Sequence, residues 1–128
     1  MDGCFVRRAE EAPRLPGAYV LLIALKGPVE VVVPPGRTRL EAGRYLYCGS
    51  AHGPGGIRAR LSRHMRSGKS VRWHVDQLTE TGTVAGAWVF PGAGECELVR
   101  VLSHLQAPLP GFGSSDCSRC VSHLLSWP

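Results

Sequence analysis

The sequence lacks the features of a membrane or exported protein. No apolar run reaches the roughly 18 residues that a membrane span requires. The first residues, MDGCFVRRAEEAPR, carry acidic groups and no apolar signal segment. Repeats and low-complexity tracts are also absent, and 128 residues fit one domain. Five cysteines, an odd number without an export signal, indicate reduced thiols. We therefore expect one cytoplasmic domain with no membrane partner.

Acidic residues are missing from residues 42–75, although the whole chain has ten. The same stretch holds seven basic residues on an otherwise near-neutral body, which is typical of a protein that binds a polyanion. The alternative is a solvated basic helix face. We expect nucleic acid as the partner, DNA rather than RNA. The predicted phosphate contacts are Arg58, Arg63, Arg66, Lys69 and Arg72.

Hydrophobic periodicity predicts an α+β fold in which a small mixed or antiparallel β-sheet is flanked by helices. Strands are predicted over residues 18–25, 29–33, 44–48 and 84–90. Helices are predicted over residues 57–67, 73–79 and 95–105, and a loop over residues 34–43. Residues 1–16 are interpreted as a loose N-terminal arm. Residues 17–128 are interpreted as a single domain whose apolar C-terminal segment docks as a cap.

Five segments, spread over residues 17–125, carry a family resemblance: GAYVLLIAL, GRYLYCGSA, GIRARLSRH, WHVDQL, and GFGSSDC with a following HLL. In this order they resemble the GIY-YIG nuclease superfamily, and more closely a small prokaryotic branch of it, the DUF123 family. The resemblance implies a GIY-YIG-like fold. It also implies a metal-dependent endonuclease that hydrolyses nucleic-acid phosphodiesters.

The resemblance assigns roles to four side chains. Tyr19 would act as the general base or relay to it, and Tyr47 would orient water or phosphate. Arg60 would stabilise phosphate charge through its guanidinium fork. His64, four residues later, lies where related nucleases place a Tyr or His. Each has a simpler reading: the tyrosines as ordinary strand aromatics, and Arg60 and His64 as members of a solvated basic face.

A carboxylate of the last helix would hold one Mg²⁺ or Mn²⁺, since hard cations take oxygen ligands. Glu97 is favoured as this metal ligand because it lies inside the predicted helix, whereas Glu95 is interpreted as a charge that offsets the helix dipole. Asp116 is the reserve candidate. Further possible neighbours of the site are Ser50, His74, Asp76 and Asp116.

The C-terminal segment contains a C-x2-C-x2-H pattern formed by Cys117, Cys120 and His123. Zinc at these residues would need a fourth ligand, from Cys96, His64 or His104. We favour the alternative, in which small buried thiols pack the cap.

Three functions remain open from the sequence. The first is the endonuclease, and the second is a catalytically inactive nucleic-acid-binding module of the same fold. The third is a small zinc-stabilised interaction domain, for which the C-terminal cysteines are the support.

Overall fold

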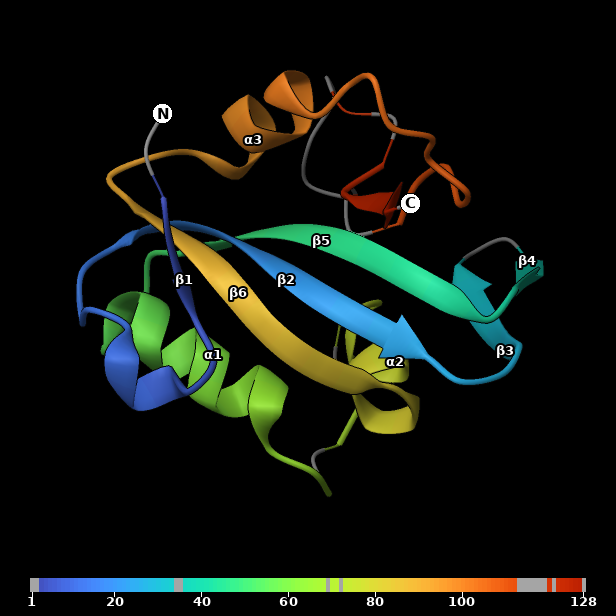
Figure 1. Ribbon diagram of the computed structural model, residues 1–128, viewed down its shortest axis with the longest axis horizontal. Helices are drawn as coiled ribbons and strands as arrows, with labels where there is room; N and C mark the ends of the chain where they lie inside the picture. Colours follow the sequence, from blue (N-terminus) through green and yellow to red (C-terminus); the bar gives the residue numbers. More distant parts are fainter. Residues whose placement is uncertain are drawn as a thin grey trace.

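Five antiparallel strands form the central sheet of the molecule, in the order β1-β6-β2-β5-β7 (Figure 1). The computed structural model describes residues 3–33, 36–68, 70–71, 73–112, 120 and 122–127. The strands of this sheet are β1 Cys4–Val6, β2 Gly17–Leu25, β5 Gly43–Ala51, β6 Thr83–Pro91 and β7 Leu124–Trp127. Together with the helices, they confirm the predicted α+β class.

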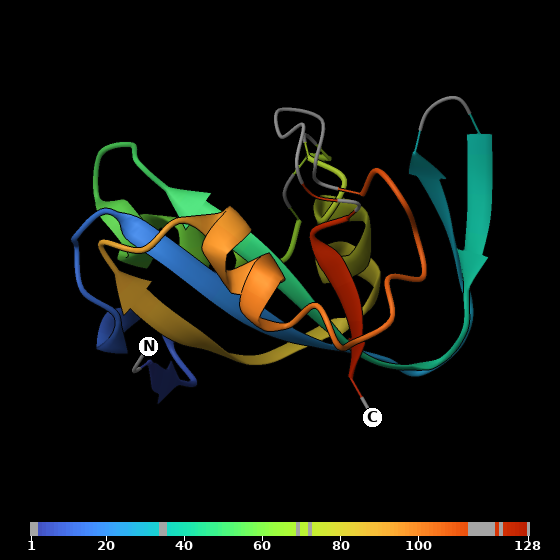
Figure 2. The same cartoon turned by 90° about the horizontal axis from the view of Figure 1, so that it is seen from above.

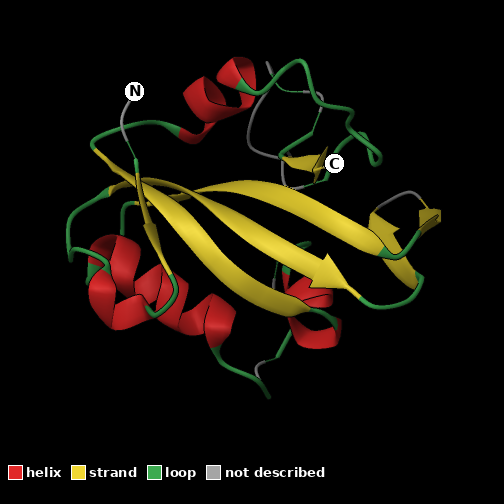
Figure 3. Ribbon diagram, viewed as in Figure 1, coloured by secondary structure: helices red, strands yellow, loops and turns green. Residues whose placement is uncertain are grey.

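Helices cover both faces of this sheet (Figures 1 and 3). Helices α1 Gly56–Met65 and α2 Asp76–Thr81 lie on one face, and α3 Glu95–Val101 lies on the other. Because β2 is sandwiched between these layers, its side chains are buried on both sides, which is why its sequence is almost continuously apolar. None of the helices in the described ranges is long and apolar enough to cross a membrane.

The N-terminal segment is part of the fold, which corrects the loose arm expected over residues 1–16. Strand β1 pairs with β6, and the 3₁₀ helix η1 Ala9–Glu11 follows it. The backbone N–H of Ile57 donates to the carbonyl of Leu15 at 2.9 Å, so this segment satisfies an otherwise unpaired donor in the first turn of α1. Gly56 permits the approach, because its φ is +58° and a Cβ there would collide with the Leu15 carbonyl.

Strands β3 Val29–Val33 and β4 Gly36–Leu40 form a separate two-stranded sheet, which projects beyond the main sheet (Figure 2). Strand β4 replaces part of the loop expected over residues 34–43. Its first four residues are exposed, so they show no apolar alternation. The side chain of Gln77 in α2 fixes the hairpin, accepting from the N–H of Val32 at 2.8 Å and donating to its carbonyl at 2.9 Å.

The described part of the C-terminal segment docks onto the body, as the sequence predicts. Strand β7 pairs with β5, and Phe112, Leu124 and Leu125 are buried. The predicted helices are all present, although α3 ends at Val101 rather than at residue 105. Turns follow α3 and lead toward a proline-containing stretch at residues 108–110, which cannot continue a helix.

Candidate active site

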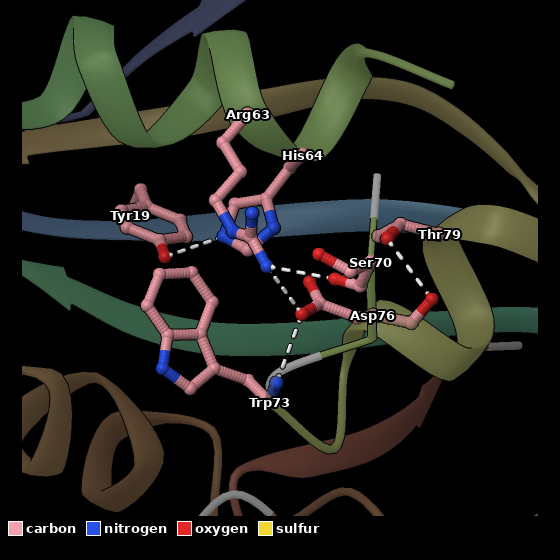
Figure 4. A network of polar contacts seen from close by, with 7 residues as sticks. All are labelled: Tyr19, Arg63, His64, Ser70, Trp73, Asp76 and Thr79. Atoms are coloured by element: carbon pink, nitrogen blue, oxygen red, sulfur yellow. Dashed lines mark hydrogen bonds and ion pairs between the residues drawn. The ribbon is translucent and has the colours of Figure 1, made fainter. Parts of the chain in front are cut away.

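Tyr19 and His64 form a buried hydrogen-bonded pair between the sheet and α1. The Tyr19 hydroxyl lies 2.7 Å from Nε2 of His64, and each residue is 1% exposed. Figure 4 shows Tyr19 on β2 and His64 on α1 pointing toward each other. His64 reaches the sheet because it shares α1 with Ile57 and Leu61, whose burial fixes the rotation of the helix.

Tyr47 and Arg60 complete the expected group of four. The Tyr47 ring centroid lies 6.3 Å from that of His64, in an edge-on arrangement. The guanidinium carbon of Arg60 lies 4.5 Å from the centroid of the Trp73 ring, which is itself 6.0 Å from His64. The structure therefore brings Tyr19, Tyr47, Arg60 and His64 to one face of the sheet, with the indole of Trp73 beside Arg60 and His64.

Burial dominates the electrostatics of the two phenols. It raises the pKa of Tyr19 well above its usual range, while the charge of Arg60 and its hydrogen bond to the phenol act in the opposite direction. Burial likewise raises the pKa of Tyr47, and the charge of Glu95 adds to the effect. At neutral pH both groups are therefore phenols. Tyr19 is suited to donating a proton to His64 rather than to persisting as a phenolate.

Alkaline pH is expected to unfold the protein as its tyrosines ionise. All three, Tyr19, Tyr45 and Tyr47, have pKa values raised mainly by burial. Above about pH 10 the unfolded chain releases phenolic protons that the folded chain retains, so the free energy of unfolding falls as pH rises. Phenolate absorbance and near-UV circular dichroism should therefore change together. Phenolate absorbance that appears at about pH 10, the usual pKa of tyrosine, while the near-UV dichroism stays native would contradict this.

Gly49 gives the Tyr19 ring its space. The two residues are cross-strand partners, and a Cβ at position 49 would lie 2.5 Å from both Cζ and the hydroxyl of Tyr19. The sequence offered Gly49 only as part of the segment GRYLYCGSA and did not predict this contact.

Gly49→Ala is accordingly expected to destabilise the fold by about 1–3 kcal/mol, because overpacking forces the buried ring to move. Chemical denaturation measures the effect. Gly36→Ala is the matched control, since a Cβ there meets nothing within 4 Å. Equal stabilities of the two variants would show that the ring is not confined by Gly49.

Two of the arginines expected to contact phosphate have structural partners. Nε of Arg58 donates to the carbonyl of Ala12 at 2.7 Å. Nη2 of Arg63 lies 2.6 Å from Oδ2 of the fully buried Asp76, which also accepts from the N–H of Trp73 (Figure 4). Arg66 is exposed. Lys69 and Arg72 lie outside the described residues.

The two carboxylates of α3 have different surroundings. The Glu97 side chain is exposed, and its carboxylate accepts from the N–H of Gly94 at 3.2 Å, which caps the helix. Glu95 instead has a charge that raises the pKa of both Tyr19 and Tyr47. The sequence favoured Glu97 as metal ligand, whereas Glu95 is the half-buried carboxylate of α3 whose charge acts on both phenols. Asp116 lies outside the described residues.

The other residues expected near the site lie in different surroundings. Ser50 is half-buried on β5, where strand alternation turns its side chain to the face opposite Tyr47. The His74 ring packs on Phe112 at 5.5 Å, so Trp73 rather than His74 covers the site. Asp76 positions Arg63 and the Trp73 backbone. Cys117 lies outside the described residues, while Cys120 and His123 lie near Cys96.

Comparison with known proteins gives one match. The sequence model of the family described as "Domain of unknown function DUF123" matches residues 18–128. No curated protein and no solved structure matches the chain. The matched range contains every residue of the candidate site but excludes β1 and η1.

Proposed function

The chain belongs to the DUF123 family, and we propose that it is a metal-dependent endonuclease of the GIY-YIG type, hydrolysing phosphodiesters of nucleic acid, DNA rather than RNA. The 2.7 Å contact between the Tyr19 hydroxyl and Nε2 of His64 carries this proposal. It links a phenol to a proton acceptor, next to the Arg60 cation. These are the groups needed to deprotonate water and to stabilise a pentavalent phosphate.

In this mechanism Tyr19 transfers a proton without becoming charged. Its oxygen accepts the proton of the attacking water as its own proton moves to Nε2 of His64. The transfer is coupled because burial disfavours a free phenolate. Arg60 stabilises the negative charge that develops on the phosphate, and Tyr47 confines the reacting groups beside His64.

Of the two carboxylates of α3, Glu95 is the better candidate to hold a hard cation, because it is half-buried while Glu97 is exposed, and because its charge acts on both phenols. Bound there, Mg²⁺ or Mn²⁺ would neutralise charge on the phosphate oxygens. Glu97 fits less well, since its carboxylate caps its own helix.

A groove near α1 supports contact with a nucleic-acid backbone. It has a volume of about 340 Å³ and lies between the N-terminal segment and the helix, with Arg7, Arg8 and Arg66 among its lining residues. Arginine pairs readily with phosphate oxygens, and such contacts bind without regard to sequence. This surface would add phosphate contacts to those that the sequence gave to Arg58 and Arg63.

A cleavage assay tests the proposal. The wild type should cut at least one member of a panel of flapped, branched and nicked DNA and structured RNA, with Mg²⁺ or Mn²⁺. Tyr19→Phe should lose this activity by on the order of 10²–10³, since it removes only the hydroxyl. Tyr45→Phe is the matched control, because its hydroxyl donates to the Glu41 carbonyl away from the site. Equal activity of the two variants would refute the role of Tyr19.

The second candidate is a non-catalytic nucleic-acid-binding module. The exposed, capping position of Glu97 favours it, as does the burial of both phenols, which are 1% and 8% exposed. Tight binding to the panel without cleavage, under either metal, would establish this alternative.

A further inference from the structure

A second group of reactive side chains gathers at the start of α3, next to Glu95. Cys96 comes from the first turn of α3, while Cys120 and His123 come from the segment before β7. Their ligand atoms all lie within 4.8 Å of one another, and Sγ of Cys96 is 4.0 Å from Nε2 of His123. The residues are 27 positions apart at their widest. The fold, rather than proximity in the sequence, therefore brings Cys96 to the other two residues.

These separations are close to those of zinc ligands. Zinc binds sulfur at about 2.3 Å and imidazole nitrogen at about 2.0 Å, so tetrahedral ligands lie roughly 3.6–3.8 Å apart. The observed 4.0 Å between Sγ of Cys96 and Nε2 needs a small contraction, and the widest separation in the group, at most 4.8 Å, needs one of about 1 Å at most. Two thiols and one imidazole also form a donor set that favours zinc over Mg²⁺ or Mn²⁺.

His123 is fixed in position by its burial and by two backbone hydrogen bonds. It is fully buried, its N–H donates to the Phe112 carbonyl at 2.8 Å, and its carbonyl accepts from the N–H of Cys48 at 2.9 Å. Its Nδ1 makes no hydrogen bond within the described structure but lies 3.6 Å from Oε2 of Glu95. Nε2 is thus turned toward the sulfur, with a carboxylate behind the other nitrogen. Metal-binding histidines commonly have this arrangement.

We propose that Cys96, Cys120 and His123 bind one Zn²⁺ through Sγ, Sγ and Nε2. This site uses ligands other than those of the proposed nuclease cation and extends beyond the proposed function, although Glu95 lies next to both. Both thiols line a cavity of about 390 Å³, whose wall also includes Arg100, Leu105 and Leu125. Among the described residues only these three ligands gather, and we assign the fourth position to water or a small donor ligand from this cavity.

Metal analysis of the full-length protein, purified without nucleic acid or added Mg²⁺, tests the proposal. We expect about one zinc per chain. Cys96→Ser, Cys120→Ser and His123→Gln should each lose it, whereas Cys4→Ser should keep it, because Cys4 is exposed on β1. Glu95→Gln should weaken zinc affinity by about 10–100-fold, since it removes the carboxylate behind the imidazole.

Cobalt titration of the wild type keeps the test valid if a variant fails to fold. Bound Co²⁺ should give the strong visible bands of a tetrahedral site and a thiolate charge-transfer band in the near ultraviolet. Added imidazole should shift the visible bands by entering the open position. Retention of zinc by the ligand variants, absence of these bands, or a disulfide between Cys96 and Cys120 would overturn the site. Loss of zinc from Cys117→Ser would overturn the open fourth position.

The two proposals fail separately. A protein that binds zinc but cuts nothing removes the nuclease and leaves the zinc site. A protein that cuts nucleic acid but binds no zinc refutes the zinc site and leaves the nuclease proposal intact.

Discussion

Replacing Arg60 with alanine is expected to slow phosphodiester cleavage by on the order of 10²–10³ while leaving most nucleic-acid binding intact. The guanidinium opposes the burial that keeps Tyr19 protonated, and it is the cation that acts on this phenol. Its main effect should fall on charge that develops in the transition state. Single-turnover cleavage and equilibrium binding, measured in parallel, separate the two contributions.

Arg37→Ala is the matched control for this variant, because Arg37 is an exposed cation on β4, paired with Glu30. It should change neither rate nor fold. Thermal unfolding of Arg60→Ala measures the stability lost with the Trp73 contact, so that this loss can be separated from the effect on cleavage. If binding and cleavage fall by the same factor, with the rate of the bound complex unchanged, Arg60 serves binding alone.

Asp76→Ala is expected to destabilise the protein by about 3–5 kcal/mol, because it leaves a mostly buried cation without its partner. The Asp76 side chain is fully buried and the Arg63 side chain is 19% exposed, with 2.6 Å between Nη2 and Oδ2. The same oxygen accepts from the N–H of Trp73 at 2.8 Å. The variant should therefore also release the indole from the site. Denaturant unfolding and tryptophan fluorescence measure the two effects.

Glu30→Ala provides the comparison. It breaks an ion pair of 3.0 Å whose side chains are 72% and 62% exposed, and it should cost less than about 1 kcal/mol. A similar small cost for Asp76→Ala would mean that solvent reaches Arg63 and replaces the lost carboxylate.

The long strands and the first helix were predictable because burial leaves a periodic pattern. β2 is apolar on both faces, and Ile57 and Leu61 mark the buried stripe of α1. β1 and β4 were not predictable in this way. β1 has one buried residue and β4 one, so each strand depends on backbone pairing with a partner that the sequence does not identify.

The candidate site was likewise predictable from the sequence only in part. The family resemblance singled out Tyr19, Tyr47, Arg60 and His64, and the structure brings these four side chains to one face of the sheet. The Arg63–Asp76 pair was not foreseen, because it depends on how the chain turns between α1 and α2. The same is true of Cys96, which the sequence offered only as one of three possible fourth ligands and which the fold brings beside Cys120 and His123.

Both outer strands of the sheet come from the ends of the described chain: β1 beside β6, and β7 beside β5. They have three and four residues, whereas the strands they cover have nine each. A fragment cut at the start of the family match, residue 18, would leave the side of β6 facing β1 unpaired, since β1 ends at Val6. Exposed edges of this length recruit other chains. Such a fragment should self-associate more than the full chain as its concentration rises, which light scattering of the two proteins would measure.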